Sequence, residues 1–87
     1  MRIDELPVGA EFRFDSSSDN YMCRSCVHVV IGPTVLHGTA FIVAKCVRPC
    51  STEGGYHYSS GRQQEYYCHR GVELVAQPVP DLFEEGL

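Results

Sequence analysis

Cysteine and histidine are the residues of this 87-residue chain whose types and spacing could do chemistry. Cys23 and Cys26 form a Cys-x-x-Cys pair, and Cys46 and Cys50 follow with three residues between them. Two short chelating pairs of thiolates, brought together by a fold, can hold a structural zinc ion in tetrahedral coordination. Cys23, Cys26, Cys46 and Cys50 are therefore candidate metal ligands.

Two other interpretations of the cysteines remain open. A disulfide or redox centre would pair Cys23 with Cys26, or one of them with Cys50, but no helix is predicted after Cys26 to give the setting of a thioredoxin-type motif. Cysteine also fills tight core positions as a small apolar side chain. We favour core filling, so no cofactor is expected, and zinc is the alternative.

The histidines do not form a catalytic motif. None stands with a Ser or Cys and a carboxylate at a spacing that indicates nucleophilic catalysis, so an enzyme is not expected. His28 is expected on the same strand face as Cys26 and Val30, and His69 could substitute as a fourth metal ligand.

The charge balance argues against one class of partner. Seven Lys and Arg stand against eleven Asp and Glu, which gives a net charge of −4. Phosphate-backbone binding needs a concentrated cationic face, so nucleic acid is not an expected partner. Among the tyrosines, Tyr66 is expected in the core, whereas Tyr67 and the others are expected in loops or partner contacts.

Membrane insertion is not expected. The first residues, MRIDELPVG, contain no apolar run typical of a signal peptide, and no segment approaches the roughly 20 apolar residues that a membrane helix needs. A soluble cytoplasmic protein is the expectation. Five cysteines are an odd number, which suits a reducing compartment.

The apolar pattern is that of β-strands almost throughout. Phe12 and Phe14 alternate with charged residues, as in a strand with one buried face. Gly32-Pro33 is expected to end the second strand, because proline supplies no ladder donor. The predicted strands cover residues 11–15, 21–31, 39–48, 64–68 and 72–76.

Five short strands in so few residues can bury their faces only by curling. The predicted fold is all-β, a small five-stranded SH3-like barrel or compact antiparallel sandwich over residues 1–77. Residues 78–87 form a Pro-rich and acidic tail, in which 81–85 can make one helical turn. The tail is a candidate partner-binding peptide through the residues Asp81, Leu82, Phe83, Glu84 and Glu85.

Hairpin pairing gives the cysteines an expected position. If the second and third strands turn at Val35 and Leu36, Cys26 lies opposite Lys45 or Cys46, and Cys23 lies opposite Arg48 or Pro49. A next hairpin centred on residues 56–57 would place Cys68 opposite Lys45 or Cys46 as well. The cysteines are then expected to gather near one end of a three-stranded sheet.

Three stretches resemble a known kind of protein. They are residues 6–14 (LPVGAEFRF), 30–34 (VIGPT), and 65–69 (EYYCH) leading to 72–75 (VELV). Their turn-and-strand pattern resembles the small β-barrel proteins of bacteriophages and prophages over residues 3–76. Cys68 stands where such proteins often have Phe, and the Cys23 and Cys26 pair is not part of the pattern.

The resemblance implies a phage accessory protein without an active site that could be carried over, and a location in the host bacterial cytoplasm. We therefore expect a non-enzymatic protein-binding module, with an inhibitor of a bacterial defence complex, of the anti-CRISPR kind, as the sharper version. The alternative is a small zinc-stabilised structural domain or virion component.

Overall fold

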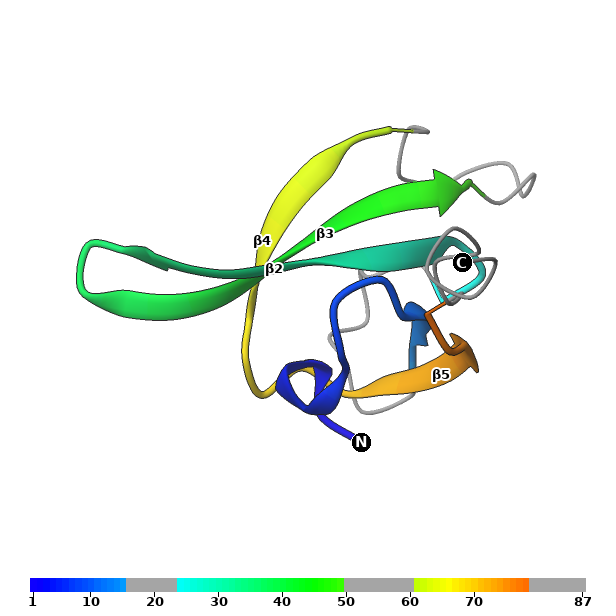
Figure 1. Ribbon diagram of the computed structural model, residues 1–87, viewed down its shortest axis with the longest axis horizontal. Coiled ribbons are helices and arrows are strands. Elements are labelled where there is room, and N and C mark those ends of the chain that lie inside the picture. The colour runs from blue at the N-terminus through cyan, green and yellow to red at the C-terminus, as the bar shows by residue number, and fades with distance from the viewer. Residues whose placement is uncertain (16–23, 50–60, 79–87) are drawn as a thin grey trace, which may run out of the picture.

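The fold is all-β, as predicted: five antiparallel strands form one sheet in the order β4-β3-β2-β1-β5 (Figure 1). The computed structural model describes residues 1–15, 24–49 and 61–78. Its elements are the 3-10 helix η1 (Ile3–Glu5) and the strands β1 (Glu11–Phe14), β2 (Val27–Leu36), β3 (Thr39–Arg48), β4 (Gln63–Tyr67) and β5 (Val72–Ala76). The predicted bounds of β3 and β5 are confirmed.

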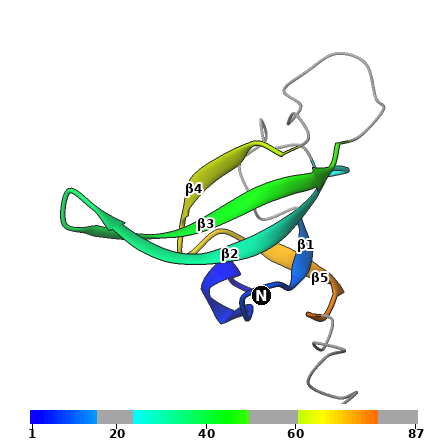
Figure 2. The ribbon, with the colours of Figure 1, turned by 45° about the horizontal axis from the view of Figure 1, so that its top comes forward.

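The sheet curls on itself, so that β1 and β5 cross beneath β2, β3 and β4 (Figure 2). Two strands separate β1 from β4 in the sheet, yet the rings of Phe14 and Tyr66 lie 4.9 Å apart between their centroids. The first residues of the chain run beside the β4–β5 connection, where Ile3 donates to the Arg70 carbonyl at 2.9 Å and Arg2 bridges Gly71. These backbone bonds hold the N-terminal segment against the connection between β4 and β5, the two outer strands of the sheet.

The core is apolar and rich in aromatic rings. Phe12 and Phe14 are fully buried, as their alternation with charged residues predicts, and the predicted burial of Tyr66 is also confirmed. Ile3 of η1 is fully buried as well, although the sequence pattern did not predict a structured segment there. The nearby buried residues are Ala10, Val30, Ile42, Ala44 and Val72.

The turn between β2 and β3 differs from the prediction. It is formed by His37 and Gly38, both with positive φ, 52° and 78°. Two-residue hairpin turns of this kind need positive φ at both central positions, which Gly accepts and β-branched Val resists. The turn predicted at Val35 and Leu36 is therefore wrong, and the register moves with it.

β2 continues past Gly32 and Pro33, which were expected to end it. A register irregularity between Val30 and Gly32 absorbs one residue, and pairing with β3 then continues to Leu36 opposite Thr39. Because hydrogen-bonded and non-bonded pairs alternate from a two-residue turn, the nitrogen of Pro33 faces the open edge of β2. No bond to β3 is lost there, so proline is tolerated.

Some predictions lie outside the described residues. These are residues 21–23 of the predicted second strand, the predicted hairpin centre at 56–57, and positions 79–87 of the tail, including its candidate partner-binding residues 81–85. Within the ranges that the structure describes, no helix has the length and apolar character needed to cross a membrane.

Candidate functional site

A projecting hairpin is the most prominent feature of the surface (Figures 1 and 2). We call residues 31–40 the arm. Backbone pairing of β1 with β2 stops at Val30, and pairing of β4 with β3 begins only at Phe41. The two strands of the arm are therefore hydrogen-bonded in the sheet only to each other, and both of their outer edges lack a neighbouring strand within the described residues.

The arm is uncharged and exposes apolar side chains. No Asp, Glu, Lys or Arg occurs between Arg24 and Lys45. Val35 is 67% exposed, Ile31 42% and Leu36 39%, and Val8, 61% exposed, lies beside Gly32 at the base of the arm. Charged side chains usually protect exposed strand edges from pairing with another chain. The arm has none, and Pro33 and the irregular register of β2 interrupt its open edge instead.

A cluster of rings adjoins the arm. We call Phe41, Tyr67, His69 and Arg70 the Tyr67 cluster. The ring of Tyr67 lies 5.2 Å from that of Phe41 and 5.6 Å from that of His69, and the Arg70 guanidinium lies 5.4 Å from it. Tyr67 nevertheless remains 47% exposed, although it lies on β4 and not in a loop. Tyr and Arg are residue types that anchor protein interfaces.

Two of the four candidate cysteine ligands lie within the described residues. Cys26 and Cys46 are both fully buried near one end of the β2–β3 pairing. Cys46 lies opposite His28, whereas Cys26 was predicted to lie opposite Lys45 or Cys46. That prediction is wrong, because the turn at His37-Gly38 places Val27 opposite Arg48. Cys23 and Cys50 lie outside the described residues, and within those residues no three metal-ligating side chains come together.

Cys68 does not join the other cysteines, which corrects a second expectation. β4 pairs Tyr67 with Phe41, and the Cys68 sulfur lies 3.6 Å from the Ala40 carbonyl oxygen. Ala40 and Cys46 are six residues apart on β3, about 20 Å along an extended strand. His69 stacks on Tyr67 near the same place, so neither residue is near Cys46.

His28 is a fully buried histidine of the core. Its ring lies among Phe12, Phe14 and Tyr66, with centroid distances of 5.4, 5.1 and 6.2 Å. Cys26 and Val30, which were expected on the same strand face, are buried as well, although Cys26 precedes β2 and is not part of the strand. Removal from water disfavours the charged imidazolium and lowers the pKa of His28 from 6.5 to about 4. The imidazole is therefore neutral near pH 7.

Comparisons with known proteins add no further constraint: no protein-family model, curated protein or solved structure matches the chain. The geometry of the described residues is therefore the basis for assigning a function.

The sequence prediction missed the arm, because it ended β2 at Gly32-Pro33. The signal that could have found it is His37-Gly38, a turn pair between two apolar runs.

Burial of His28 predicts a pH dependence of stability. Its pKa is about 4 in the folded protein and about 6.5 in the unfolded chain, so between these values the unfolded chain binds the extra proton. The free energy of unfolding should fall by about 3 kcal/mol as pH drops from 6.5 to 4, and this term should level off below that range. Urea titrations across this range measure it.

His28→Leu should remove that part of the pH dependence, because the other titrating groups are unchanged. The matched control is His37→Asn, which replaces a histidine in the exposed turn and should keep the wild-type slope. Equal slopes for wild type and His28→Leu would contradict the burial of a neutral imidazole.

Proposed function

We propose that the chain is a non-enzymatic protein-binding module that contacts its partner through the arm and the Tyr67 cluster. The observation that carries the proposal is the arm itself, an uncharged apolar hairpin that extends beyond the pairing of its neighbours. A two-stranded ribbon is marginal in water on its own, and burial of its apolar side chains against a partner would stabilise it.

Side chains support this mode of contact better than strand addition does. Pro33 places a residue without an N–H donor on the open edge of β2, which interrupts the ladder that a partner strand would need. Val35 and Leu36 can insert into a partner's apolar surface, and Tyr67 supplies a ring whose position is held by Phe41 and His69. A ring held in place loses little conformational freedom on binding.

The sharper version is an inhibitor of a bacterial defence complex, of the anti-CRISPR kind, in a phage or prophage protein. The resemblance of residues 3–76 to phage β-barrels and the net charge of −4 support it. The acidic surplus would meet a basic nucleic-acid-binding surface. A competition assay tests this version, because the chain should reduce nucleic-acid loading of the complex that it binds.

The arm variant Val35→Lys tests the binding proposal. A lysine at the arm places a charge in the apolar contact, so affinity for the purified partner should fall by about tenfold or more. The partner is first recovered on immobilised wild-type chain, then purified, and its dissociation constant is measured by interferometry. Gln77→Lys is the matched control, since it adds the same charge at an exposed position after β5.

Thermal unfolding of both variants shows whether each one folds. An unchanged dissociation constant for folded Val35→Lys would exclude the arm as the contact surface. Equal weakening by Gln77→Lys would mean that net charge, not the arm, governs binding.

A zinc-stabilised structural domain or virion component is the second candidate. The observation that favours it is the complete burial of Cys26 and Cys46 near one end of the β2–β3 pairing, with Cys23 and Cys50 close to them in sequence. Structural zinc contributes folding free energy directly, because its ligands converge only in the folded state.

Elemental analysis of protein purified without chelator tests the zinc candidate. About one zinc per chain is expected, and Cys26→Ser should lose the metal while the control Cys68→Ser keeps it, since Cys68 lies at the other end of β3. A zinc content well below one per chain in the wild type would rule this candidate out.

A further inference from the structure

The charges of the described residues are distributed differently from those of the whole chain. All seven Lys and Arg lie in the described ranges, but only six of the eleven acidic residues do. The surplus of negative charge therefore belongs to residues 16–23, 50–60 and 79–87. The curled sheet itself is close to electrically balanced.

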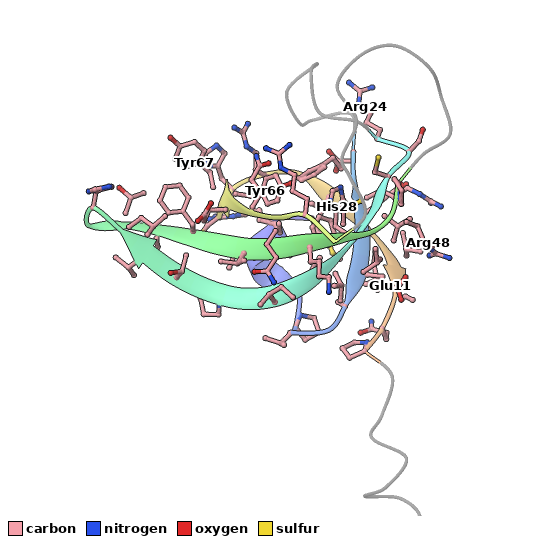
Figure 3. The ribbon with its side chains drawn as sticks, turned by 90° about the horizontal axis from the view of Figure 1, so that it is seen from above. Glu11, Arg24, His28, Arg48, Tyr66 and Tyr67 are labelled. Carbon is pink, nitrogen blue, oxygen red and sulfur yellow. The ribbon has the colours of Figure 1, made fainter. Side chains whose placement is uncertain are left out.

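Four of the seven cations gather where β2 begins, β3 ends and β4 begins. Arg48 lies opposite Val27, Lys45 lies opposite Gln63, and the Arg62 carbonyl accepts a bond from the Cys46 backbone N–H at 3.0 Å. Arg24 stands three residues before β2. We call Arg24, Lys45, Arg48 and Arg62 the basic end. Figure 3 shows Arg24 and Arg48 at the end of the β2–β3 hairpin opposite the arm.

Among the described residues, ion pairs neutralise this end only in part. Arg48 lies 3.0 Å from the Glu11 carboxylate. Within the part of the chain that the structure describes, no ion pair involves Arg24, Lys45 or Arg62. Arg24 and Arg62 are exposed. By contrast, Arg2 and Arg13, the two cations on the N-terminal segment and β1, are each paired with a carboxylate.

We infer that the basic end is a second binding surface, separate from the arm, for an acidic segment of a protein partner. Three of its four cations are arginines, whose planar guanidinium groups match carboxylates in a two-pronged geometry. The half-buried Val29 and Val47 lie among them and can contact the apolar parts of a peptide chain. Charge complementarity would steer an acidic segment to this end and set its orientation.

Nucleic acid fits the basic end less well. Binding to unpaired bases uses aromatic side chains as stacking platforms, and the exposed tyrosine among the described residues, Tyr67, lies toward the arm (Figure 3). Affinity for phosphates grows with the number of counterions released, and a group of four cations releases few.

Fluorescence anisotropy with a labelled peptide of about ten glutamates tests the inference. In about 50 mM NaCl, where screening is weak, the full chain should bind this peptide. The double variant Arg24→Gln and Arg62→Gln should weaken binding by about tenfold, because it removes two exposed charges of the basic end. The matched control is Arg2→Gln and Arg13→Gln, which changes the net charge equally and should keep most of the affinity.

Three results would overturn the inference. They are an absence of binding to the glutamate peptide, equal weakening by the two double variants, and tighter binding of a labelled oligothymidylate than of the peptide. Val35→Lys should leave peptide binding unchanged. The outcome at the basic end is therefore independent of whether the arm contacts a partner.

Discussion

The packing of β1 aromatic rings against β2 and β4 is the interaction on which the rest of the structure depends. Phe12 stacks on His28 of β2, and Phe14 reaches Tyr66 of β4. The contact with Tyr66 joins β1 to a strand that is not its neighbour in the sheet, so the sheet must curl to bring the two together. The ring of His28 is enclosed by the same contacts, which is why its pKa falls to about 4.

Strand length explains the arm. β2 and β3 have ten residues each, whereas β1 has four and β4 and β5 have five. Only the part of the long hairpin that lies beside the short strands can be buried in the curled core. The remainder extends as the arm, and its lack of charge suits contact with another surface rather than with water. Arg24 and Arg48 of the basic end lie at the opposite end of the same hairpin (Figure 3).

Periodicity in the sequence predicted much of the fold. The alternation of Phe12 and Phe14 identified a half-buried strand, and the apolar run at 39–48 identified β3 with its correct bounds. The register failed because it depends on the turn, and a shift of a few residues changes every cross-strand neighbour. Proline at position 33 was interpreted as a strand end, since sequence alone does not show that its nitrogen faces an open edge.

The candidate site was less predictable than the fold, because it depends on pairing between distant residues. The arm exists only because β1 and β4 stop pairing before its base, and the basic end exists only because three strand ends meet. Cys68 shows the same dependence, since its position beside Ala40 follows from the β3–β4 register. Composition gave the net charge correctly but could not show where the cations gather.

Native-state hydrogen exchange, followed residue by residue by NMR, tests the central claim most directly. If the aromatic core holds the curled body and the arm is supported only by its own pairing, the amides of Val30 and Ala44 should exchange only through global unfolding. The amides of Leu36 and Thr39 should exchange at a clearly lower opening free energy. Equal protection in the arm and in the body would contradict this account.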